Sequence, residues 1–169
     1  TIFNAAQNLG NNVTALSVSL FEFDVRDLGG DSFSTIMTSA TILLNDAAGN
    51  LRRIALYDGA TELAEIPAVN GALSFTGFSL TIPNGTTKRL YLRVTFQDNV
   101  TDNSSIGFTI NSAIASGVGS GFAAFAPLTS SIAGNNNKIT VVATQLTFPN
   151  AIGNQVINTN FSPAVEIGR

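Results

Sequence analysis

The chain has 169 residues, of which 44% are hydrophobic and 11% are charged, and its net charge is −3. This length suffices for one good core, and the low charge offers no basic surface for nucleic acid or anionic lipid. The absence of histidine and cysteine excludes disulfides, imidazole acid–base catalysis, Ser–His–Asp and Cys–His nucleophiles and ordinary zinc sites. No apolar run reaches the roughly 18 residues of a membrane-spanning helix, and from the start at Thr1 we expect either a processed piece or a recombinant fragment.

The predicted elements are short strands, beginning with "ALSVSLFEFDVRD" at 15–27. Its apolar alternation changes phase near Leu20 and Phe21, which predicts a β-bulge or burial on both faces. The clearest strand is 87–98, in which alternate residues from Leu90 to Phe96 are apolar. Turn signals rich in Gly, Asn and Asp separate the strands. The other predicted strands lie at 35–44, 52–58, 72–75, 78–82, 105–110 and 138–148.

This pattern predicts an all-β fold, an antiparallel β-sandwich of immunoglobulin-like or jelly-roll-like type, with roughly seven to nine strands between residues 16 and 132. No segment carries a capped apolar stripe of helical period. The stretch "GVGSGFAAFAPL" is expected to be an irregular crossover that brings Phe122 and Phe125 into the core. The residues predicted to face inward are Leu16, Val18, Phe23, Ile42, Ile54, Leu56, Phe75, Leu80, Leu90, Leu92, Val94, Phe96, Phe108 and Ile110.

A polar run, "IAGNNNK", predicts a hinge that divides the chain. We expect a β-sandwich module at 1–134, and a hinge with a C-terminal strand extension at 135–169. The apolar phase of this extension switches between Val141 and Val142, so the tail from 138 to 167 is predicted to pair with a neighbouring unit. The alternative is that it folds back as edge strands of its own sandwich. The predicted assembly residues are Ile139, Val141, Val142, Leu146, Phe148, Ile157, Phe161, Val165 and Ile167.

Several segments resemble, in order, a β-rich module of very large, repetitive bacterial extracellular proteins of the kind exported by type IX secretion. They are "EFDVRDLGGDSFSTIMTSATILL", "LRRIALYDGATELAEI", "FTGFSLTIPNGTTKRLYLRVTF", "VTDNSSIGFTINSA" and "GNNNKITVVATQLTF". The resemblance extends from about residue 3 to 167, and implies that an immunoglobulin-like domain starts at "VVATQLTF" and "SPAVEI". It also implies an extracellular or cell-surface location and a structural or adhesive role, and it supplies no catalytic or ligand-binding residues to carry over. The sequence departs from the pattern at Arg169, where that next domain would continue.

Acidic loops supply the only candidate metal ligands, because hard cations such as calcium prefer carboxylate and loop carbonyl oxygens. None of the loops has a spacing as specific as an EF-hand. Ordinary turn chemistry, in which Asp and Asn accept hydrogen bonds from nearby backbone amides, is the favoured interpretation. We expect no cofactor, and any bound ion to be calcium. The weak calcium candidates are Asp27 with Asp31, Asp46 with Asn50, and Asp98 with Asp102.

Three functions remain open at this stage. We predict a non-enzymatic structural module of an extracellular bacterial surface protein or filament, assembling through β-strand contacts with copies of itself or with adjacent domains. The alternative is an adhesin module that binds carbohydrate, such as surface glycans, or another surface; its sugar platform would be built from Tyr57, Tyr91 and nearby phenylalanines. A third hypothesis is an enzyme resting on Glu22 and Asp24, which lie on one face of a strand, although a solvated face is favoured. No nucleic-acid partner and no membrane span are expected.

Overall fold

The computed structural model describes residues 2–4, 9–28, 31–102, 104–115, 128–129, 137–140, 146–148 and 155–157. In this part of the chain every regular element is a strand, and no helix is present that could span a membrane. The strands are β1 (Ile2–Asn4), β2 (Ser19–Arg26), β3 (Thr35–Asn45), β4 (Leu51–Asp58), β5 (Thr61–Pro67), β6 (Gly71–Phe75), β7 (Leu80–Ile82), β8 (Thr87–Phe96), β9 (Ser105–Ala115), β10 (Leu128–Thr129), β11 (Asn137–Thr140), β12 (Leu146–Phe148) and β13 (Gln155–Ile157).

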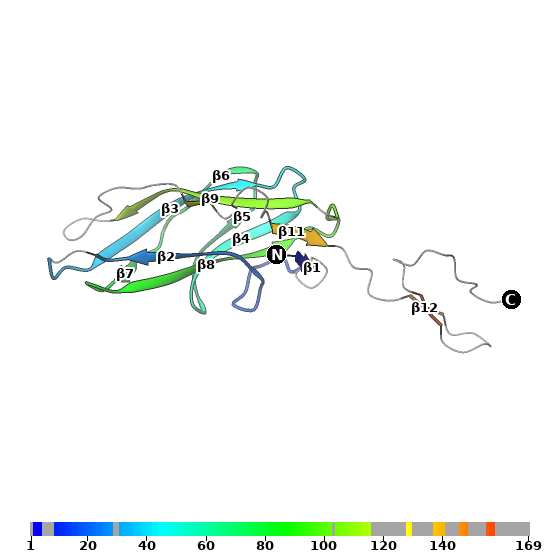
Figure 1. The fold of residues 1–169 in the computed structure, drawn as a ribbon, viewed down its shortest axis with the longest axis horizontal. Coiled ribbons are helices and arrows are strands. Elements are labelled where there is room, and N and C mark those ends of the chain that lie inside the picture. The colour runs from blue at the N-terminus through cyan, green and yellow to red at the C-terminus, as the bar shows by residue number, and fades with distance from the viewer. Residues whose placement is uncertain are drawn as a thin grey trace.

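The strands form two packed layers, seen nearly edge-on in Figure 1. One layer is a four-stranded antiparallel sheet in the order β2-β8-β4-β5. The other has the order β1-β11-β9-β3-β6, with β7 also paired to β3 and β10 to β9. Its β1–β11 pair is parallel, and the remaining pairs between described strands are antiparallel. The predicted all-β antiparallel sandwich is therefore confirmed.

Each predicted strand position between residues 15 and 110 coincides with an observed strand. The predicted bulge is also confirmed, because the register of β2 against β8 shifts between Ser19 and Phe21. The strand β5 was not predicted. Its sequence "TELAEIP" lies at the edge of the sheet and is exposed or half-buried throughout, so it lacks the alternation of a strand that packs on a core.

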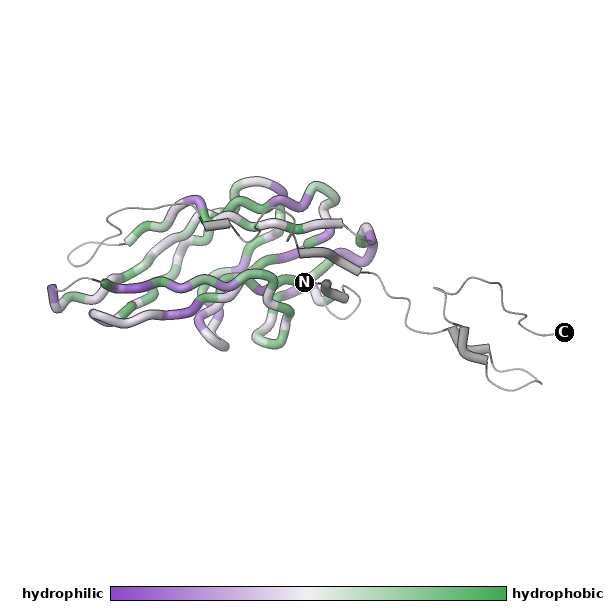
Figure 2. Tube along the Cα trace, viewed as in Figure 1, coloured by the Kyte–Doolittle hydropathy of each residue, from purple (hydrophilic) through white to green (hydrophobic). Residues whose placement is uncertain are grey.

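The core lies between the two layers, and Figure 2 shows hydrophobic positions alternating with hydrophilic ones along the strands. All the residues predicted to face inward are buried except Val18, which is half-buried against the core, and Leu16. The prediction for Leu16 is wrong: its side chain is 95% exposed. It lies in a turn that precedes β2 and is closed by a hydrogen bond from Ser17 N to Thr14 O (3.0 Å).

The tail contributes two separate pairings. β11 pairs with β9 (Asn137↔Ile106, Lys138↔Ser105) and with β1, so at residues 137–140 the tail pairs within its own sandwich. The prediction that the tail joins a neighbouring unit is wrong for this strand, since the start of β9 offers it an open edge. β12 and β13 pair with each other in a separate two-stranded sheet. For them pairing with a neighbour stays a prediction, as does the boundary at 134/135.

Some predicted residues fall outside the description. For four assembly residues only the backbone position is described: Ile139 in β11, Leu146 and Phe148 in β12, and Ile157 in β13. The remaining assembly residues and both phenylalanines of the crossover lie outside the described residues, namely Val141, Val142, Phe161, Val165, Ile167, Phe122 and Phe125.

Candidate functional site

Residues 9–18, here called the strap, cross the outer face of the four-stranded sheet. Val13 of the strap is buried and packs with Ala55 and Tyr57, two outward-facing residues of β4. Because the strap covers this face and the core covers the other, β4 is buried on both sides from residue 54 to 57. This small second core, outside the sandwich, attaches the strap to the outer face of the sheet.

Two arginines fasten the strap to the central strands of the sheet. Arg52 of β4 donates from Nη1 to the backbone oxygen of Leu9 (3.0 Å) and to the side chain of Asn11 (2.7 Å). Arg93 of β8 donates from Nη1 to the backbone oxygen of Ser17 (2.8 Å). Hydrogen bonds from a charged donor to a backbone oxygen are stronger than neutral ones. The strap is thus held at both ends by charge-assisted bonds.

The guanidinium of Arg93 lies over two aromatic rings, 5.5 Å from the Tyr57 centroid and 5.4 Å from that of Tyr91. The Tyr57 hydroxyl donates to Glu62 (3.0 Å) and lies 3.4 Å from the backbone oxygen of Val13. Burial, followed by the hydrogen bond to Glu62, raises the pKa of Tyr57 to about 12. The Tyr57 phenol therefore stays protonated, and remains a donor, throughout the physiological pH range.

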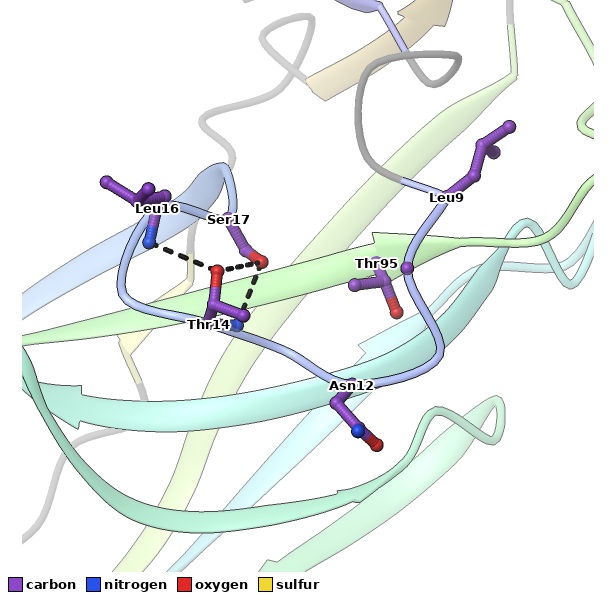
Figure 3. A pocket seen from close by; sticks show the side chains of 7 residues that line it. Leu9, Asn12, Thr14, Leu16, Ser17 and Thr95 are labelled. Carbon is purple, nitrogen blue, oxygen red and sulfur yellow. Dashed lines mark hydrogen bonds between the residues drawn. The ribbon is translucent and has the colours of Figure 1, made fainter.

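An open pocket of about 230 Å³ lies between the strap and β8 (Figure 3). At its base Thr95 is 2% exposed, and its Oγ1 has no hydrogen-bond partner. Thr14 and Ser17 bond to each other and to the strap backbone. The walls are uncharged, so this pocket suits a water molecule or a small neutral hydroxylic group. Its lining residues are Leu9, Gly10, Asn12, Thr14, Leu16, Ser17 and Thr95.

The carboxylate pair of the enzyme hypothesis lies beside a second open pocket, of about 320 Å³, lined by Glu22, Phe23, Asp24 and Arg89. Arg89 donates from Nε to Asp24 (2.8 Å), and Arg26 approaches the same carboxylate at 3.4 Å. The hydrogen bond from Arg89 is the main cause that lowers the pKa of Asp24. Asp24 is therefore held in its ionised form, whereas a general acid of a glycosidase needs a raised pKa.

Of the calcium candidates, Asp46 and Asn50 are both buried and brace one loop. Asp46 accepts hydrogen bonds from Leu51 N (2.8 Å) and from Asn50 Nδ2 (3.2 Å). Asn50 also bonds to Ser104 Oγ (2.7 Å) and to Thr101 N (2.6 Å). Buried polar groups are tolerated when they are bonded in this way. These two side chains join the 46–50 turn to the 97–104 loop.

In the other two candidate pairs, the aspartates described by hydrogen bonds or ion pairs bond to protein groups. Asp27 is buried and accepts from both the amide and the hydroxyl of Thr35 (2.8 Å each), while Asp31 accepts from Phe33 N (2.9 Å) in its own turn. Asp98 pairs with Arg52 at 2.7 Å, and Asp102 lies exposed in the following loop. Across the described ranges, no group of three or more acidic residues could hold a metal ion. Of these bonds, only that from Phe33 N to Asp31 is local turn chemistry, since Asp27 and Asp98 bond to residues more distant in the chain.

The aromatic residues of the suggested sugar platform are not gathered on an exposed face. Phe75 and Phe96 are fully buried in the sandwich core, and Phe78 is half-buried against it. Tyr57 is buried beneath the strap with Arg93. These rings serve packing, as the favoured interpretation of the sequence had it.

Sequence reasoning missed the strap and the residues under it. Tyr91, Arg93 and Thr95 form the phase of β8 opposite the predicted core residues. The available signal was the Thr14-to-Ser17 spacing, because a serine or threonine that bonds to nearby backbone marks a turn. This spacing does not show which face of the sheet the turn would cover.

Comparisons with protein-family models, with curated proteins and with solved structures found no match to this chain.

Proposed function

We propose that this chain is a structural module of an extracellular bacterial surface protein or filament, assembling through β-strand contacts with neighbouring units. The observation that carries the proposal is the pairing of β12 with β13, which are bonded to each other and to no other described strand. A lone two-stranded sheet is marginal in water. Further strands, from another copy or from an adjacent domain of a longer chain, would complete it by strand addition.

The polar side chains of the sandwich support a structural role, since they are used to hold strands together. One ion pair links each neighbouring pair of strands in the four-stranded sheet: Asp24 with Arg89 between β2 and β8, Asp58 with Lys88 between β4 and β8, and Glu65 with Arg53 between β4 and β5. Cross-strand pairs of opposite charge stabilise a sheet. The buried aspartates Asp27 and Asp46 hold loops by accepting hydrogen bonds from the backbone amides of Thr35 and Leu51.

Removal of residues 146–169 tests the proposal, because it deletes β12 and β13 but keeps β11 within the sandwich. The full chain should associate as its concentration rises, by light scattering and analytical ultracentrifugation. The truncated chain should be a monomer with the same circular dichroism and thermal midpoint. A full chain that stays monomeric at all concentrations, or a truncated chain that associates equally, contradicts the proposal.

A second candidate, a module that binds neutral carbohydrate, is favoured by the pocket under the strap and the unpartnered hydroxyl of Thr95. It ranks lower because about 230 Å³ is below the roughly 300–1,000 Å³ of typical small-molecule sites. A glycan array probed with the wild type and with Thr95→Val tests it. Binding that Thr95→Val abolishes would favour this function, and an array without signal removes it.

A further inference from the structure

The first and last strands of the sandwich lie side by side and run in the same direction. β1 pairs with β11 in parallel, with Ile2↔Lys138, Phe3↔Ile139 and Asn4↔Thr140, and β11 is anchored in turn on β9. Figure 1 shows both arrows pointing the same way at one end of the sandwich. Pulling the two ends of the chain apart would therefore slide β1 and β11 in opposite directions along their axes. In this shear geometry, the hydrogen bonds between the strands share the load and do not open one at a time.

The strap follows β1 along the chain and forms a second point of resistance. Arg52 and Arg93 hold it to β4 and β8, the two inner strands of the four-stranded sheet. Both anchors have further partners, Arg52 in Asp98 at 2.7 Å and Arg93 in the rings of Tyr57 and Tyr91. If β1 detaches, tension on the N-terminal side passes into the strap, and from there to the centre of the sheet.

We infer that this module bears mechanical load, with β1–β11 as a shear clamp and the strap as a second catch behind it. The inference rests on the proposed function only for the origin of the tension, which a surface protein or filament would receive along its chain. Resistance to force is governed by the unfolding barrier and not by equilibrium stability. Contacts that must break first under load can therefore change the unfolding rate strongly, even where they contribute little to the free energy of folding.

Single-molecule force spectroscopy on the full chain, with handles at both ends, tests the clamp. The chain has no cysteine, so Phe3→Cys with Ile139→Cys introduces a single defined pair. Adjacent strands lie close enough for a disulfide. Under oxidising conditions the cross-link should remove about 460 Å of released length, at about 3.4 Å per residue between the two positions. Under reducing conditions that length should return. Failure to cross-link, or full release when oxidised, overturns the β1–β11 clamp.

The strap is tested by Arg52→Ala, with Arg89→Ala as the matched control. Both arginines lie on the four-stranded sheet and pair with an aspartate, but only Arg52 holds the strap. Pulled from its ends, the Arg52→Ala chain should unfold about tenfold faster at constant force, as expected for the loss of two charge-assisted hydrogen bonds. Arg89→Ala should unfold at the wild-type rate. Equal rates for the two variants overturn the strap as a catch.

The direction of pulling provides the decisive control. Handles at Ala60→Cys and Asn84→Cys, two exposed turn positions, load β5 and β7 from their ends and bypass both β1 and the strap. The unfolding force should be clearly lower in this direction and insensitive to Arg52→Ala. An equal force in both directions refutes load bearing by shear. That result would leave the proposed surface module untouched, since its own test measures association and not force.

Discussion

The two faces of β4 and β8 show how the same strands can be buried by different means. On the inner face, Ile54, Leu56 and Leu92 pack in a core made by two sheets, and their burial follows from alternation along each strand. On the outer face, Tyr57, Arg93 and Thr95 are covered by ten residues of the strap, which are distant in sequence. The comparison teaches that period two identifies a strand and its core face. The other face is covered by a segment that is distant in sequence, and alternation within the strand does not reveal it.

The largest expected effect is on the inner face. Leu92 is fully buried, and Leu92→Asp should unfold the domain, because an unpaired buried carboxylate costs about 3–5 kcal/mol beyond the lost apolar contacts. Circular dichroism and urea titration measure this, with Leu92→Ala as a control that should stay folded at a cost of about 2–5 kcal/mol. A wild-type midpoint for Leu92→Asp would mean that the register of β8 is wrong.

The same substitution on the outer face should do less. Val13→Asp should cost about 2 kcal/mol, because the strap can open locally and let the carboxylate reach water while both sheets persist. Limited proteolysis should show cleavage within residues 9–18, with the far-ultraviolet spectrum of the sandwich unchanged. Global unfolding equal to that of Leu92→Asp would show that the strap is not a separable layer.

Tyr57 on the outer face should also make the stability of the sandwich fall at alkaline pH. The pKa of Tyr57 is raised from 10 to about 12 in the folded chain. The folded state thus favours the neutral phenol, so this stability is complete below pH 10 and is lost as pH rises from 10 to 12. Because the chain has two tyrosines and no tryptophan, absorbance at the tyrosinate band can follow it. Tyr57→Phe should lack the late phase and lose less stability over that interval; an unchanged titration contradicts the burial of Tyr57.

The smallest expected effect is at Thr95. Thr95→Val keeps the shape of a buried side chain whose hydroxyl has no partner, so the free energy of unfolding should change by less than about 1 kcal/mol, and towards greater stability. Thermal denaturation measures it, with Thr35→Val as the control, since the Thr35 hydroxyl bonds to buried Asp27 and its loss should destabilise. A clear destabilisation by Thr95→Val would reveal a bound water or ligand on this hydroxyl.

Most of the sandwich could be predicted because its strands pack on one core and so alternate. The bulge in β2 was visible in the sequence for the same reason, since two apolar phases meet at Leu20 and Phe21. The edge strand β5 could not be found this way, as its exposed and half-buried residues leave no period. Leu16 was misplaced because the alternation of "ALSVSL" continues through a turn whose geometry is set by hydroxyl-to-backbone bonds.

The candidate site could be predicted only in part. The acidic loops gave two interpretations, and the hydrogen bonds of Asp31 and Asp46 are local, as in the turn chemistry that was favoured, whereas Asp27 bonds to Thr35, eight residues away. The sequence could not show that the Asn50 side chain would reach a loop some 50 residues away. Nor could it place Arg93 over the ring of Tyr57, because that contact needs the pairing of β4 with β8 to be known first.

The strand order has a consequence for how this chain reaches its native state. β2 pairs with β8 and β3 with β9, so neither of the first two long strands bonds to its successor in sequence. Only β3 gains early partners, in β6 and β7. Pairings between distant segments make folding slow, on the order of milliseconds to seconds. Until residues 105–115 have been synthesised, one edge of β3 stays unpaired. During that interval the nascent chain is most prone to incorrect strand pairing with other chains.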